Sequence, residues 1–137
     1  MKVHTTNYKN NFIKVAEDIS VEKSEIPAVK RNKTLANIQY EMLAANPYKH
    51  TSDDVLFECF AQKNNITESE RKSARETFFS KGQPCLRSSA LAKRYGFGFH
   101  FNDDSKVALV PMESTEYENF SCDENLEQTK AMRNKQG

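Results

Sequence analysis

A chain of 137 residues has the length of one domain, and it can bury enough surface to fold without a metal or a disulfide. Its formal net charge of +1 excludes the binding of polyanions through bulk electrostatics. No apolar stretch approaches the roughly 20 residues that span a bilayer, and the N-terminus has no apolar signal-peptide core. We therefore expect a cytoplasmic protein with no membrane partner.

The first predicted element is a strand over residues 11–17, where Ile13 and Val15 alternate with polar residues. Residues 18–33 show no periodicity and predict a long loop. Thr34 is the predicted N-cap of a helix with the sequence LANIQYEMLAA. Its predicted apolar face consists of Leu35, Ile38, Met42 and Ala45.

Two further helices are predicted in the middle of the chain. Thr51 and two acidic residues after it favour the N-terminus of the second helix. The apolar stripe predicted for this helix consists of Val55, Leu56, Cys59 and Phe60. The third helix begins at Thr67, with Glu70 completing a capping box, and ends near Lys81, before Gly82. Its thin apolar content indicates that it faces water.

The last third of the chain predicts a short helix, a hairpin and another short helix. Ser88 or Ser89 caps the first helix, which runs through Tyr95. Residues 96–101 and 106–110 then read as two strands joined by a polar turn. The period of two places Phe97, Phe99 and Phe101 on one face, and Gly98 and His100 on the other. Residues 114–120 predict the last helix, and the chain is expected to be weakly ordered from about residue 122.

This element order predicts the α+β fold class. We expect a small antiparallel sheet, made of the C-terminal hairpin and a candidate N-terminal strand, packed with three to five helices. The strand or a helix is needed because a lone hairpin is marginal in water. The predicted organisation is a single domain over residues 1–121 and a weakly ordered tail over residues 122–137.

Charge is distributed unevenly along the chain. Residues 68–100 carry seven basic and three acidic side chains, whereas residues 103–127 carry one basic and eight acidic. The simplest interpretation is that the two segments pair within the molecule. The alternative, and the first hypothesis of function, is a binding protein whose basic Arg87–His100 surface recognises a small external anion, such as a phosphate or carboxylate, or a protein partner. The residues predicted to bind such a ligand are Arg87, Ser88, Arg94, Tyr95 and His100.

A nucleic-acid-binding module is the second hypothesis. Two helices followed by a hairpin resemble a winged helix, with Arg71, Lys72 and Arg75 on the recognition helix. Nearby glutamates and the long separation from the hairpin argue against it. The hairpin string YGFGFHF also partly matches an RNA-recognition motif, in which aromatic rings stack on bases. Three consecutive helices do not fit that fold, so buried rings are the simpler interpretation.

An enzyme with Cys85 or His100 in its site is the third hypothesis. Basic neighbours favour the thiolate form of a cysteine, but Cys85-Leu-Arg87 lacks the longer phosphate-binding loop of cysteine phosphatases. The three cysteines are spaced too irregularly for a disulfide framework or a zinc site. We expect reduced thiols, no metal and no cofactor.

Four strings of the sequence occur together in a known family: HTTNY, TSDDVLF, FFSKGQPCLRSS and KRYGFG. With these strings, the chain resembles an uncharacterised family of small bacterial proteins, a domain of unknown function. The resemblance extends from His4 to about Phe120. It implies a bacterial, cytoplasmic, stand-alone domain, and it carries no catalytic role or substrate.

Overall fold

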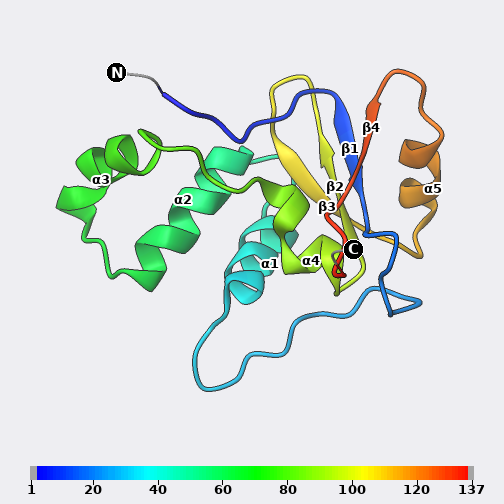
Figure 1. Cartoon of the computed structure of the whole chain (residues 1–137), viewed down its shortest axis with the longest axis horizontal. Helices are drawn as coiled ribbons and strands as arrows, with labels where there is room; N and C mark the ends of the chain where they lie inside the picture. Colours follow the sequence, from blue (N-terminus) through cyan, green and yellow to red (C-terminus); the bar gives the residue numbers. More distant parts are fainter. Residues whose placement is uncertain (1–2, 136–137) are drawn as a thin grey trace.

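The computed structural model describes residues 3–135, in which five helices pack with a four-stranded mixed sheet (Figure 1). The strands are β1 (Asn11–Lys14), β2 (Phe97–Phe101), β3 (Val107–Pro111) and β4 (Glu127–Lys130). The helices are α1 (Leu35–Ala45), α2 (Ser52–Lys63), α3 (Arg71–Phe78), α4 (Ala90–Lys93) and α5 (Thr115–Ser121), with two 3₁₀ turns, η1 (Glu68–Glu70) and η2 (Leu86–Ser88). The first two residues of the predicted domain and the last two of the predicted tail lie outside the described residues.

The strands are ordered β3-β2-β1-β4 across the sheet. β2 and β3 form the predicted hairpin, and β1 pairs antiparallel to β2, with Asn11 opposite Phe101. The α+β class and the third strand are therefore confirmed. The sheet is mixed rather than wholly antiparallel, because β4 pairs parallel to β1. Strand β4 was not predicted from the sequence, and it lies in the segment that was expected to be weakly ordered.

The two faces of the sheet are covered by different helices. The rings of Phe97, Phe99 and Phe101 are buried, as predicted, and they belong to the main core together with residues of α1 and α4. On the opposite face, α5 packs over Phe12, whose ring lies 5.1 Å from that of Tyr117. Figure 1 shows α5 alone on its side, with the other helices across the sheet.

Helix α1 begins where the sequence predicts, but its buried face differs. Thr34 caps it, and its side chain accepts a hydrogen bond from the Asn37 amide. Of the four residues predicted to be buried, only Ile38 is fully so, and Leu35 is 49% exposed. Asn37 and Gln39 are buried instead, because neighbouring groups satisfy their amides. Asn37 donates to the Pro27 carbonyl, and Gln39 accepts from the Ser89 hydroxyl.

Helices α2 and α3 form a separate small cluster beyond the main core. Its buried members are Phe57, Ala61 and Phe79, and the ring of Phe78 packs against them. The predicted caps are present at Thr51 and Thr67. Helix α3 has no buried residue, as expected, but it ends at Phe78, three residues earlier than predicted. A boundary between two clusters is a place where packing leaves room for a cavity.

The N-terminal segment joins the parts of the chain that carry the family strings. The side chain of Asp53, in the first turn of α2, accepts hydrogen bonds from the Thr6 amide and hydroxyl, each at 2.7 Å. The His4 amide donates to the Phe79 carbonyl. The Tyr8 hydroxyl lies 3.2 Å from the sulfur of Cys85. Residues 4–8 therefore hold α2 and the segment after α3 in a fixed relation.

Candidate functional site

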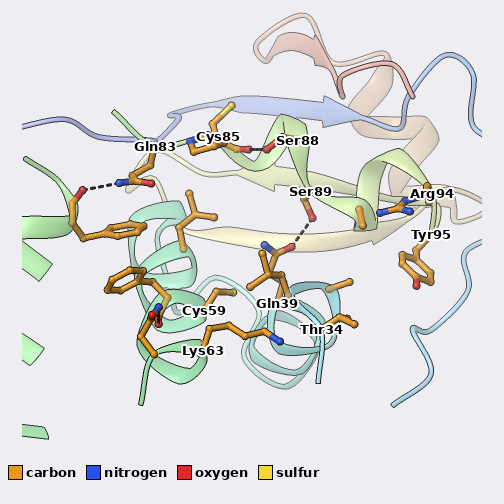
Figure 2. Close-up of a pocket in the computed structure, with 18 residues that line it drawn as sticks. Thr34, Gln39, Cys59, Lys63, Gln83, Cys85, Ser88, Ser89, Arg94 and Tyr95 are labelled. Carbon is orange, nitrogen blue, oxygen red and sulfur yellow. Dashed lines mark hydrogen bonds between the residues drawn. The ribbon is translucent and has the colours of Figure 1, made fainter. Parts of the chain in front are cut away.

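A hollow lies where the two clusters meet, between α1, α2 and residues 83–95. It has a volume of about 720 Å³ (Figure 2). Its wall combines apolar side chains with a few polar ones. The lining residues are Thr34, Leu35, Ala36, Gln39, Leu56, Cys59, Phe60, Lys63, Asn64, Phe78, Gln83, Pro84, Cys85, Ser88, Ser89, Ala90, Arg94 and Tyr95. We refer to this hollow as the central pocket.

One end of the central pocket is aromatic. The rings of Phe60 and Phe78 lie 4.8 Å apart and both are partly exposed to the pocket. Leu56 and Pro84 also line the pocket. The side chain of Gln83 closes the aromatic end by donating to the Phe78 carbonyl at 2.8 Å. This end can surround the apolar part of a ligand.

A buried polar pair interrupts the apolar wall near its middle. The Ser89 hydroxyl donates to the side-chain oxygen of Gln39 at 2.5 Å (Figure 2). Ser89 also caps α4, because its hydroxyl accepts from the Leu91 amide. Cys59 lines the same pocket. Burial raises the pKa of Cys59 to about 11, so this thiol stays protonated and unreactive at neutral pH.

Two cations and no carboxylate line the central pocket. The ammonium group of Lys63 donates to the backbone carbonyl of Lys33 at 2.5 Å, which holds it beside the start of α1. Arg94 follows α4 and is exposed at the other end, next to Tyr95 (Figure 2). Neither cation forms an ion pair within residues 3–135. Both can therefore meet an anion from solution.

The structure divides the five residues predicted to bind an anionic ligand. Ser88, Arg94 and Tyr95 line the central pocket, whereas Arg87 and His100 do not. The guanidinium of Arg87 donates to the Lys130 carbonyl at 2.7 Å, so it connects η2 to β4. Alternation along β2 places His100 on the opposite face of the sheet, under α5. The five side chains do not converge on one point.

His100 takes part in a small aromatic cluster on that opposite face. Its ring is stacked on Phe120, with centroids 4.0 Å apart and planes 9° from parallel. Its Nδ1 atom lies 2.7 Å from the Tyr48 hydroxyl. Burial lowers the pKa of His100 from its ordinary value, an effect that the Asp123 carboxylate opposes. The imidazole is therefore neutral at pH 7 and serves packing.

Lowering the pH from 7 to 5 should destabilise the wild-type protein more than a His100→Gln variant. Because the pKa of His100 is lowered on folding, the unfolded chain binds more protons at this site once the pH falls below about 6.5. This contribution to stability is constant above that pH and is lost as the pH falls through the folded pKa. Thermal unfolding midpoints at several pH values measure it. Carboxylates titrate equally in the wild type and in His100→Gln, so the difference between the two proteins reports on His100. An equal fall of the unfolding midpoint with pH in both proteins would contradict the prediction.

Cys85 does not have the surroundings of a catalytic thiol. Its sulfur points away from the central pocket and toward the Tyr8 hydroxyl (Figure 2). Burial, and next the hydrogen bond with Cys85, raise the pKa of Tyr8 to about 12, so the phenol stays protonated and cannot act as a base at neutral pH. No histidine lines the pocket. Among residues 3–135, the group that contacts the Cys85 sulfur is therefore a protonated phenol rather than a base.

The three cysteines should differ in their reaction with iodoacetamide. Cys122 is exposed, Cys85 is half-buried, and Cys59 is buried with a raised pKa. We expect Cys122 to react first, and Cys59 to react only when the protein unfolds. A time course at pH 8 followed by mass spectrometry measures the order, and urea-denatured protein serves as the control. Faster labelling of Cys85 than of Cys122 would revive the enzyme hypothesis.

The cations proposed for nucleic-acid binding are largely neutralised by α2. Arg71 forms a two-pronged ion pair with Glu58, with its shortest contact at 2.7 Å, and it also approaches Glu68. Arg75 pairs with Asp54 at 3.0 Å. Lys72 is exposed and forms no ion pair in the described part of the chain. The hairpin lies within the sheet, next to β1, rather than projecting as a wing.

The expected pairing between the basic and acidic segments of the chain is wrong. Within residues 3–135, no ion pair joins residues 68–100 to residues 103–127. The acids that meet Arg71 and Arg75 belong to α2, and α5 lies across the sheet from them. Two further features are absent from the described residues. No group of histidine, cysteine and acidic residues is placed to hold a metal, and no helix is long and apolar enough to cross a bilayer.

Comparison of the chain with known proteins identifies its family. A model of a family of unknown function, DUF6157, matches residues 3–137. The chain belongs to this family. The resemblance inferred from the four sequence strings is thereby confirmed. Neither the curated proteins nor the solved structures contain a match to the chain.

Proposed function

We propose that this member of the family binds a small organic anion with a large apolar part, and that the central pocket holds it. The composition of the pocket wall is the observation that supports this most. Most of the wall is apolar, two cations contribute to it, and no carboxylate does. The volume of about 720 Å³ falls within the range of roughly 300–1,000 Å³ that is typical of small-molecule sites.

Each end of the pocket suits a different part of such a ligand. The guanidinium of Arg94 presents a planar set of donors that matches a carboxylate or sulfonate. The rings of Phe60 and Phe78 offer an apolar surface at the other end. The Ser89–Gln39 pair between them can bind a polar atom in the middle of the ligand. The class of ligand, an anion, is the one predicted from the sequence. The proposed binding position is narrower than predicted, because it includes only those of residues 87–100 that line the central pocket.

We further propose that the protein works in the cytoplasm. All three cysteines are free, as expected of a protein kept in a reducing compartment. The nucleic-acid-binding and enzyme hypotheses have less support. The cations predicted to bind nucleic acid are mostly paired with α2, and no base accompanies Cys85. A soluble anionic metabolite with an apolar body is the ligand that the charges and the wall favour.

A pair of fluorescent dyes tests the proposal directly. Anilinonaphthalene sulfonate and neutral phenylnaphthylamine share one apolar body and differ in the anionic group. We expect the sulfonate to bind more tightly. The Arg94→Ala substitution should weaken its binding about tenfold, as expected for the loss of one charge-assisted hydrogen bond, and leave the neutral dye unaffected.

Arg87→Ala is the matched control, because the Arg87 guanidinium lies outside the pocket and donates to the Lys130 carbonyl. It should leave the affinity for both dyes unchanged. Thermal unfolding of each variant verifies that it is folded. Equal affinity for the two dyes, or unchanged sulfonate binding in Arg94→Ala, would refute the proposal.

A further inference from the structure

The loop between β1 and α1 carries an exposed surface that is both apolar and basic. Six large hydrophobic side chains are exposed among residues 3–135, and three of them lie here: Ile26 at 67%, Val29 at 57% and Leu35 at 49% exposed. Residues 26–35 also contain three cations, Lys30, Arg31 and Lys33, and no acidic residue. Figure 1 shows this part of the chain bulging away from the helices. We refer to residues 26–35 as the basic loop.

Hydrogen bonds fix the position of the N-terminal part of the basic loop. The Glu25 amide donates to the Tyr95 carbonyl at 2.8 Å. The buried side chain of Asn37 donates to the carbonyls of Pro27 and Ala28, at 3.1 and 3.3 Å. With the backbone held at these points, the side chains of Ile26 and Val29 stay in solvent. Their exposure is a property of the fold.

We propose that the basic loop docks on an anionic lipid bilayer. Aliphatic side chains of this kind enter the boundary between headgroups and acyl chains, while neighbouring cations meet the lipid phosphates. Lys33 is paired with Glu41 at 2.7 Å, so Lys30 and Arg31 supply most of the attraction. Ile26 and Val29 supply the apolar contact.

Charge and shape favour a bilayer over a protein partner. A stable protein interface covers about 800 Å² on each side and is rich in aromatic residues. The basic loop is a single irregular segment without an aromatic residue. The acidic helix α5 lies across the sheet from the other helices, and the acidic residues nearest the start of the loop are Glu25 and Glu113, the latter accepting hydrogen bonds from Ser24. The lack of a spanning segment in the sequence led to the expectation of no membrane partner, but a loop can bind a bilayer surface without spanning it.

The basic loop also borders the mouth of the central pocket. One end is tied to Tyr95 and the other, through the Lys33 carbonyl, to the ammonium of Lys63. Leu35 belongs both to the loop and to the pocket wall. Docking would therefore bring the pocket close to the lipid, where an amphiphilic anion dissolves. This link between the loop and the pocket, unlike the docking itself, rests on the proposed function.

A tryptophan reporter tests insertion of the loop. The chain has no tryptophan, so Val29→Trp provides a single fluorophore in the basic loop. Vesicles of phosphatidylglycerol and phosphatidylcholine should shift its emission to shorter wavelengths, and vesicles of phosphatidylcholine alone should not. Met132→Trp, at an exposed hydrophobic position elsewhere, is the control and should show no shift. Equal shifts at the two positions, or no shift with anionic vesicles, would overturn the proposal.

Vesicle flotation of the full chain measures the two contributions separately. One double variant removes the apolar contact (Ile26→Ser with Val29→Ser) and the other removes the charge (Lys30→Gln with Arg31→Gln). Each should lower the vesicle-bound fraction at least fivefold. The charge variant should also remove the dependence of vesicle binding on salt concentration. Two control variants change exposed residues of the same kinds outside the loop: Val3→Ser with Met132→Ser, and Lys9→Gln with Lys72→Gln. Both should bind vesicles as the wild type does. Loop variants that bind vesicles normally but lose a partner protein would overturn the proposal in favour of a protein surface.

The two proposals can fail independently. Arg94→Ala should lose affinity for the anionic dye and still bind vesicles, whereas Ile26→Ser with Val29→Ser should do the reverse. Dye binding in a wild-type protein that ignores anionic vesicles would refute the docking surface alone. Vesicle binding in a protein with no dye affinity would refute the ligand pocket and leave the docking surface in place.

Discussion

Replacing Gly98 by valine should lower the free energy of unfolding by about 3 kcal/mol, the largest loss that we expect from a single substitution in this chain. Gly98 lies in β2, and a Cβ atom added there would be 2.9 Å from the Ile13 carbonyl oxygen and 3.0 Å from two carbon atoms of the Phe12 ring. The first of these is backbone of the neighbouring strand and cannot move without breaking the pairing of β1 with β2. The second is held between the sheet and α5, where Phe12 packs on Tyr117 and Phe120.

Gly98→Ala should show a smaller loss than Gly98→Val, because valine adds two methyl groups to the same collision. Gly82→Ala is the matched control: its Cβ would meet nothing closer than the His4 ring nitrogen at 3.8 Å. That variant should be neutral or slightly stabilising, since alanine restricts the unfolded chain more than glycine does. Urea unfolding of the three variants provides the comparison. Similar stabilities for Gly98→Val and Gly82→Ala would show that β1 and β2 are not as close as the structure has them.

Gly98 also shows what the periodicity of a sequence can predict and what it cannot. The alternation of β2 correctly predicts three buried rings on one face and a glycine on the other. It cannot identify what approaches the glycine, because Phe12 is 86 positions away in the sequence. In the structure, the ring of Phe12 lies against Gly98, and α5 packs over that ring.

Strand β4 could not be predicted from sequence patterns, for a different reason. Its four residues, EQTK, are polar and mostly exposed, so they give no alternation of apolar side chains. Backbone pairing with β1 forms the strand, and Ala131 directly after it is 3% exposed and donates its amide to Lys14. Strands of this kind depend on a partner already in place. Only the tertiary arrangement reveals them.

The candidate site was predicted in part, since local sequence places side chains within an element but not across elements. Ser88, Arg94 and Tyr95 belong to one short segment around α4, and they do line one wall of the central pocket. Arg87 and His100 were included because they are basic and near in sequence. The opposite wall comes from α1 and α2, where Gln39, Leu56 and Lys63 gave no signal beyond that of ordinary helix residues.

Asp53→Ala should lower the free energy of unfolding by about 2–3 kcal/mol, or the thermal midpoint by roughly 10 °C for a chain of this length. The carboxylate accepts three hydrogen bonds from the N-terminal segment: two from Thr6 and one from the Thr5 hydroxyl, all at 2.7 Å. Thr6 is 6% exposed, so alanine would leave its backbone amide buried without a partner. The substitution also removes an acidic residue from the first turn of α2, where a negative charge stabilises the helix.

The control for this variant is Asp103→Ala, which removes an exposed acid in the hairpin turn and should change stability little. Asp53→Asn retains one acceptor oxygen and should fall between the two. Because residues 4–8 also connect to Phe79 and Cys85, loosening them should widen the central pocket and weaken binding of both dyes. If Asp53→Ala lowers stability but leaves dye affinity unchanged, then α1, α2 and the α4 segment maintain the pocket without the N-terminal segment. In that case, the family string HTTNY contributes to stability alone.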